Sequence, residues 1–106
     1  MKKLDDAKWV VLFIAKKRVD ITGYDKTLER MLDKVKKLPG FVHLQTFTND
    51  LGMGIAISYW KNRESISEWG ADNEHIHAQK RGIVDWYSQY QIIIAKIDDY
   101  YDFKLD

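Results

Sequence analysis

The segment Trp9–Arg18 is apolar on both of its alternating residue sets, and this constrains the fold more than any other feature. The two sets are Trp9, Val11, Phe13, Ala15 and Val10, Leu12, Ile14. A β-strand with this pattern is covered on both faces. The segment Tyr90–Tyr101, around the sequence "YQIIIAKI", has the same pattern. The chain therefore needs cover for both faces of one sheet.

The segments between these two strands predict the rest of the fold. Residues Tyr24–Leu38 have apolar side chains at helical spacing, and Pro39-Gly40 ends that helix. Phe41–Thr48 and Gly54–Trp60 read as two strands of a hairpin, and Arg63–Lys80 as a second helix. The order β-α-β-β-α-β predicts an α+β, ferredoxin-like domain with a four-stranded antiparallel sheet and both helices on one face. The 106 residues fit a single domain, 1–106.

The second face of the predicted sheet needs a cover, since an exposed apolar patch of that size marks an interface. A second copy of the same sheet is the simplest cover, which predicts a homodimer. The C-terminal stretch "DDYYDF" (98–103) is the alternative, because it could cover part of that face within one chain.

Composition and charge narrow the class of function. The chain has 17 Lys and Arg against 16 Asp and Glu, a net charge of +1, which predicts neither a nucleic-acid nor a membrane partner. RNA-recognition domains share the β-α-β-β-α-β order, but "MGIAISYW" has no basic residue, and aliphatic residues stand where the base-stacking rings of their third strand would be. The chain has no cysteine, and "MKKLDDAK" lacks the apolar part of a secretory signal. The longest apolar run, Trp9–Ala15, is too short to span a bilayer. We therefore expect a cytoplasmic protein. No NAD, FAD or ATP motif is present.

An ordered set of short motifs resembles the antibiotic biosynthesis monooxygenase (ABM) domain. The motifs are "LPGF" at the end of the first helix, "SYWKNRESISEW" from the third strand into the second helix, and "EHIHAQKRG" with "WY" downstream. The resemblance implies a dimeric α/β barrel with an apolar cavity between sheet and helices. Some members of that family are cofactor-free oxygenases of quinols and polycyclic aromatics, and others bind and degrade haem. Lys17 lies about where the haem-degrading members have an asparagine, and the spacing from Trp69 to the histidines is shorter than theirs, which argues against haem degradation.

The stretch "SEWGADNEHIHAQKRG" (67–82) is the best candidate site, and its two histidines point in nearly opposite directions on one helix. If the helix is unbroken, His77 lies near the inward stripe with Trp69 and Asn73, and His75 faces solvent. If the helix breaks at Gly70, Asp72 becomes the N-cap of a new helix and His75 could turn inward. Periodicity favours His77, whereas the resemblance favours His75.

We predict a cofactor-independent monooxygenase that oxidises an electron-rich, quinol-like aromatic with O₂, with a histidine as the base. The alternative is a non-catalytic barrel that binds haem or another planar molecule; no metal site is predicted, since the two histidines cannot converge on one ion. Three candidate site residues also have a purely structural interpretation. Trp69 could be a core residue, and Arg81 could interact with the dipole at the end of its helix. His43 could be a sheet-face residue that alternates with Phe41 and Gln45. The candidate catalytic residues are His75, His77 and Trp69, and the candidate substrate-binding residues are Asn73, Arg81, Trp60, Tyr59 and His43.

Overall fold

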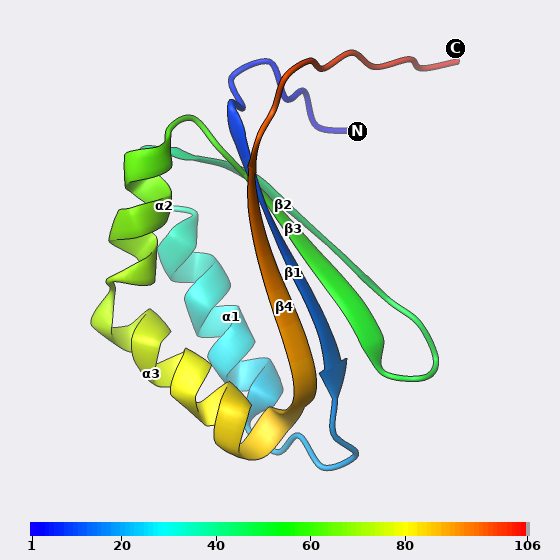
Figure 1. Ribbon diagram of the computed structural model, residues 1–106, viewed down its shortest axis with the longest axis vertical. Helices are drawn as coiled ribbons and strands as arrows, with labels where there is room; N and C mark the ends of the chain where they lie inside the picture. Colours follow the sequence, from blue (N-terminus) through cyan, green and yellow to red (C-terminus); the bar gives the residue numbers. More distant parts are fainter. Residues whose placement is uncertain (106) are drawn as a thin grey trace.

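A computed structural model describes residues 1–105 and confirms the predicted order of elements (Figure 1). A turn of π-helix, η1, joins the last helix to the last strand. The elements are β1 (Trp9–Lys17), α1 (Tyr24–Val35), β2 (Phe41–Thr48), β3 (Met53–Trp60), α2 (Arg63–Gly70), α3 (Asn73–Arg81), η1 (Gly82–Trp86) and β4 (Tyr87–Lys96).

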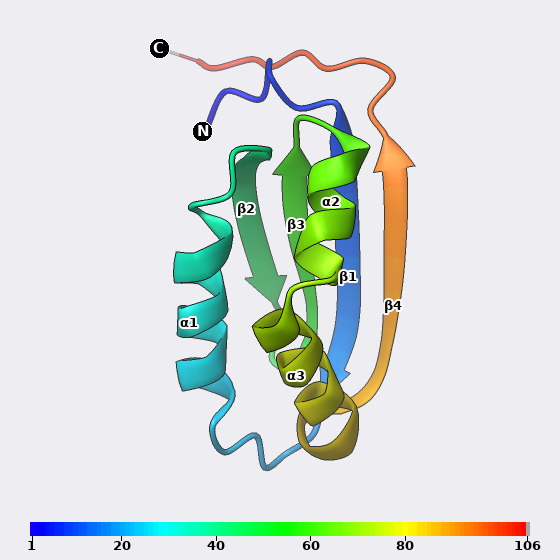
Figure 2. The ribbon, with the colours of Figure 1, turned by 90° about the vertical axis from the view of Figure 1, so that its left-hand side faces the viewer.

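The four strands form one antiparallel sheet in the order β2-β3-β1-β4, as a ferredoxin-like fold requires. All helices lie on one face of this sheet (Figure 1). In Figure 2, which looks onto that face, α2 and α3 lie in front of β3 and β1, and no helix crosses β4 at the edge. The helical layer therefore leaves one side of the sheet open along β4.

The last strand lies earlier in the sequence than predicted, at Tyr87–Lys96 instead of Tyr90–Tyr101. The reason is its partner, because β4 pairs only with β1, and β1 begins at Trp9 opposite Lys96. At the other end, Arg18 donates hydrogen bonds to the carbonyls of Val84, Ile83 (2.8 Å) and Tyr87 (3.0 Å), which hold the η1 turn against the end of β1. Pairing therefore starts at Tyr87, immediately after this turn. The first helix is also shorter than predicted, since it ends at Val35.

The predicted second helix is broken at Gly70, which confirms one of the two alternatives for this helix. Helix α2 ends at Gly70, and Asp72 is the N-cap of α3, with its Oδ1 accepting a hydrogen bond from the backbone N–H of His75 at 3.1 Å. The Nζ of Lys34 on α1 lies 2.8 Å from the Oδ2 of the same carboxylate. This Lys34 contact and the N-cap bond lower the pKa of Asp72.

A β-bulge in β2 changes which of its residues face the helices. Phe41 pairs with Trp60, but the next pair along the strands is His43 with Tyr59, so one extra residue is accommodated between them. Phe41 and Leu44 consequently face the helices, and His43 lies on the opposite face. The predicted alternation therefore holds for His43 and Gln45 but is wrong for Phe41, and His43 is a residue of the sheet face, as one of its two interpretations held.

The buried core lies where α1 and α2 meet the sheet. Val35, Trp60 and Ile66 are buried together, and Trp60, 1% exposed, donates from Nε1 to the Ser58 hydroxyl at 2.9 Å. The backbone of Gly40 packs closely against α2, because a Cβ at this position would lie 1.9 Å from the Ser65 Oγ.

The sheet face away from the helices is not covered by the C-terminal segment. Tyr101 is 87% exposed and Phe103 is 83% exposed, so the predicted alternative of cover by this segment within one chain is wrong. The segment is instead held beside the N-terminus, where Lys3 Nζ lies 3.0 Å from Asp102 Oδ1 (Figure 1). None of the helices in residues 1–105 is long and apolar enough to cross a membrane.

Candidate functional site

A cavity of about 440 Å³ lies between the helices and the sheet. Its volume falls within the range of small-molecule binding sites. Most of its walls are apolar, and Arg63 is the only lining residue with a full charge at neutral pH. The lining residues with polar side-chain atoms include Tyr24, Thr27, Ser58, Arg63, Ser67, His75, Gln79, Tyr87 and Tyr90. The cavity can hold an apolar molecule and offers it a few hydrogen-bonding groups.

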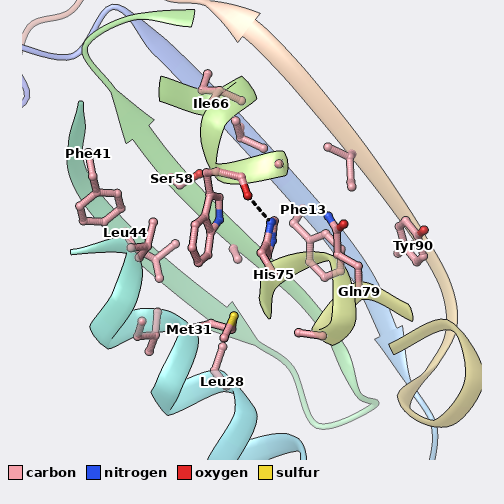
Figure 3. A pocket seen from close by; sticks show the side chains of 18 of the residues that line it. Phe13, Leu28, Met31, Phe41, Leu44, Ser58, Ile66, His75, Gln79 and Tyr90 are labelled. Carbon is pink, nitrogen blue, oxygen red and sulfur yellow. Dashed lines mark hydrogen bonds between the residues drawn. The ribbon is translucent and has the colours of Figure 1, made fainter. Parts of the chain in front are cut away.

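The helix break brings His75 into this cavity. Because α3 starts anew at the Asp72 cap, His75 lies in its first turn and faces back toward the end of α2. Its ring stacks on the indole of Trp69, with centroids 4.3 Å apart and an interplanar angle of 16°. Figure 3 shows the imidazole between side chains that reach in from α1 and β2 and side chains that reach in from β1 and β4.

One hydrogen bond determines the tautomer of His75. Its Nδ1 lies 3.0 Å from the backbone carbonyl oxygen of Trp69, drawn as the dashed line in Figure 3. A carbonyl oxygen can only accept, so Nδ1 carries the proton. In the neutral ring the lone pair is then on Nε2. This is the arrangement of an oriented base, in which one ring nitrogen is held by the protein and the other is left for a substrate proton.

The environment of His75 keeps its ring neutral. Burial lowers the pKa of His75, and the Trp69 carbonyl and the Asp72 carboxylate only partly oppose this effect. Its Nε2 has no hydrogen-bond partner among residues 1–105. Every fully buried side-chain nitrogen or oxygen in that range has a partner, so an atom without one, such as Nε2, is not fully buried. Nε2 is therefore accessible, and the cavity contains a neutral base at neutral pH.

The other predicted site residues divide into those that line the cavity and those that lie elsewhere. Trp69 and Trp60 line it together with His75. His77 and Asn73 lie on the exposed side of α3, and Arg81 Nε lies 3.0 Å from Asp85 Oδ2, outside the cavity. His43 stacks on Tyr59, with centroids 6.3 Å apart, on the sheet face away from the helices.

Several lining residues were not among the predicted site residues. Phe13, Tyr90 and Gln79 reach the cavity from β1, β4 and α3 (Figure 3). The ring of Phe13 stacks on that of Tyr90 at 5.5 Å and 27°, and it meets Tyr87 edge-on at 5.3 Å. The spacing of Gln79 four residues after His75 was a signal for it, because residues so spaced share one face of a helix.

A search of curated proteins identifies the family of the chain. The uncharacterized protein YqjZ of Bacillus subtilis (strain 168) is 34% identical over 90 residues, which cover 85% of this chain and 79% of YqjZ. The chain belongs to the YqjZ family. No protein-family model matches the chain.

Solved structures confirm that this chain has the fold of ABM-domain proteins. SnoaB of Streptomyces nogalater, a cofactor-independent oxygenase, has a TM-score of 0.73 at 9% identity, over 89% of this chain and 96% of SnoaB. Rv0793 of Mycobacterium tuberculosis has a TM-score of 0.78 at 11% identity, over 91% of this chain and all of Rv0793. A candidate antibiotic biosynthesis monooxygenase of Nitrosomonas europaea has a TM-score of 0.71 at 12% identity, over 82% of this chain and 95% of its own. At these identities the likeness concerns the fold alone.

Proposed function

We propose that the protein is a cofactor-independent monooxygenase that oxidises an electron-rich, quinol-like aromatic with O₂. The observation that carries the proposal is His75, whose Nδ1–H is held by the Trp69 carbonyl while its Nε2 is accessible in an apolar cavity. The fold shared with SnoaB, a cofactor-independent oxygenase, supports it.

The size and walls of the cavity suit a planar aromatic. An apolar cavity of about 150 Å³ holds one benzene, so about 440 Å³ accommodates roughly two to three fused rings. The stacked pair of Trp69 and His75 and the pair of Phe13 and Tyr90 offer flat surfaces to such a molecule.

The reaction starts with proton transfer from the substrate to Nε2 of His75. The substrate anion keeps the electron pair and reduces O₂ to a bound peroxide. The O–O bond then breaks, and one oxygen atom remains on the ring as a carbonyl. The other leaves as water, with the hydrogen of the oxidised ring carbon and the phenol proton that His75 returns. The apolar walls limit the access of water to the intermediate.

Oxygen uptake with product analysis across a panel of quinols and polyphenols tests this proposal. We expect His75→Ala to lower turnover by about 100-fold or more, because general-base catalysis contributes about that much. His77→Ala is the matched control, since His77 lies two residues away on the exposed side of α3, and we expect it to keep wild-type turnover. No uptake with any substrate, or equal turnover of wild type and His75→Ala, would refute the proposal. A shifted Soret band on haemin titration without oxygen uptake would instead favour the ligand-binding alternative.

We also propose that the protein works as a homodimer that buries the sheet face away from the helices. The register places Leu12, Ile57 and Ile93 side by side on this face, and Ile93 is 43% exposed. Sedimentation equilibrium tests it. We expect wild type to sediment as a dimer, and Ile93→Lys to be monomeric or insoluble. Val84→Lys, which changes a 67% exposed residue of η1, should remain dimeric. A monomeric wild type or a dimeric Ile93→Lys would rule out this interface.

A further inference from the structure

The phenol groups of the cavity are gathered toward one of its ends. Along β4 the side chains that face the helices run from Tyr87 and Tyr90 through Ile92 to Ile94, and Ile94 pairs with Val11 near the buried core. On α1, the lining residues run from Tyr24 at the first residue of the helix to Val35 at the last. The three phenol groups therefore gather where β4 begins, and the opposite end, beside Trp60, holds the polar groups of Ser58, Arg63 and Ser67 instead.

Gln79 belongs to the end that holds the phenol groups. It lies one helical turn after His75, on the same face of α3, and both side chains line the cavity. In Figure 3 its amide group extends toward Phe13, on the side of His75 nearer β4. Gln79 is exposed at the open side of the cavity, and its side chain forms no hydrogen bond within residues 1–105. An amide donor is thus free on the face of α3 that carries His75 into the cavity.

The proposed proton transfer creates a need for such a donor. When a phenol O–H bond breaks and its proton moves to Nε2, an imidazolium and a phenolate replace two neutral groups. Burial disfavours both charges, and it lowers the pKa of His75 in this structure. No cation lines the cavity at this end. Lys17 and Arg81 pack on the rings of Tyr24 and Trp86 at 4.4 and 5.2 Å, but neither side chain is among the lining residues. Arg63 is at the start of α2 and donates to Ser67 at 2.9 Å. Among the tyrosines, burial and the neighbouring Tyr24 raise the pKa of Tyr87, so it carries no charge near neutral pH.

We propose that Gln79 is a substrate-contacting residue that donates a hydrogen bond from its amide to the phenolate oxygen formed when His75 takes the phenol proton. This inference rests on the proposed function for the nature of the substrate. A hydrogen bond to a charged group favours the ionised phenol by about 10- to 100-fold. His75 removes the proton, and Gln79 stabilises the anion that remains.

A hydroxyanthraquinone dye tests the inference without turnover, because its ring is already at the quinone level and its ionised form absorbs at longer wavelength. The dye is bound to wild type and its absorbance is followed from pH 6 to 10. We expect Gln79→Leu, which has nearly the same shape, to lower the ionisation constant of the bound dye by about 10- to 100-fold. The dissociation constant of the neutral dye at pH 6 should change less than threefold.

The matched control is Gln89→Leu, the same substitution at an exposed glutamine of β4 that does not line the cavity. It should leave the ionisation of the dye as in wild type. Gln79→Asn should restore part of the effect, since the amide is kept on a shorter side chain. Equal ionisation of the dye on wild type and Gln79→Leu, or failure of wild type to bind it, would overturn the inference.

The dye experiment and the oxygen-uptake experiment can fail independently of each other. If the dye depends on Gln79 but no quinol supports oxygen uptake, the oxygenase proposal fails and the phenolate site stands. If oxygen uptake depends on His75 but dye ionisation is independent of Gln79, the oxygenase stands and the role of Gln79 falls.

Discussion

The break between α2 and α3 is set by the Asp72 cap and not by Gly70, and this yields a sharp prediction for Gly70→Ala. A Cβ at Gly70 would meet no atom within 4 Å. Positive φ angles occur only at Gly23 and Gly52 within residues 1–105, so the backbone at Gly70 suits alanine. Nothing in the geometry requires glycine at the end of α2.

We therefore expect Gly70→Ala to stabilise the protein. Replacing glycine by alanine at a compatible site restricts the unfolded chain and contributes about 0.4–1 kcal/mol. For a chain of this length that raises Tm by roughly 2–5 °C. Thermal unfolding followed by circular dichroism measures it, and an NMR titration of His75 reports whether the ring keeps its place.

Gly40→Ala is the matched control, because the same change there would place a Cβ 1.9 Å from the Ser65 Oγ and 2.4 Å from its Cβ. We expect it to destabilise the protein by about 1–3 kcal/mol. If Gly70→Ala instead lowered Tm, or shifted the titration of His75, the glycine would be required for the break and the reasoning would be refuted.

Three further predictions concern the same region. Asp72→Ala should lower Tm in thermal unfolding, opposite in sign to Gly70→Ala, because the His75 N–H loses its acceptor and Lys34 keeps only the more distant carboxylate of Glu74, at 3.3 Å. Burial lowers the pKa of His75 in the folded protein below its ordinary value of 6.5. The contribution of neutral His75 to the free energy of unfolding is therefore complete above pH 6.5. It is lost as the pH falls through the lower pKa of the folded protein. Urea unfolding should accordingly show a smaller stability difference between wild type and His75→Gln at pH 5 than at pH 7.5. Gly82→Ala would place a Cβ 2.7 Å from the Tyr87 ring, and we expect a loss of about 1–3 kcal/mol in urea unfolding with a changed near-ultraviolet spectrum.

Much of the fold was predictable because its signals are local. The alternation in Trp9–Arg18 and the helical spacing from Tyr24 onward predicted strand and helix correctly, and Pro39-Gly40 marked the end of the first helix region. The last strand was misplaced because its ends depend on pairing with β1, a contact between residues about 80 positions apart. No local pattern carries that information.

The candidate site was predictable only in part. The stretch 67–82 was recognised from its residue types, and the Asp72 cap was among the alternatives, yet the choice between His75 and His77 required the phase of α3. His43 lies on the sheet face, one of the two positions predicted for it. That Phe41 lies on the other face was missed, since a β-bulge depends on the partner strand and reverses every side chain after it. The lining role of Gln79 depends on the same phase of α3.

The open edge of β4 has a consequence for the solubility of the protein. The segment Tyr90–Ala95 contains no charge and no proline, and three consecutive isoleucines, Ile92–Ile94, are each at least 40% exposed. An unpaired strand edge of this composition is a template for addition of strands from other molecules. If the proposed homodimer forms, a variant that prevents it should therefore aggregate with rising concentration. A charge placed at Ile92 or Ile94 should reduce that aggregation, at the cost of an apolar wall of the cavity.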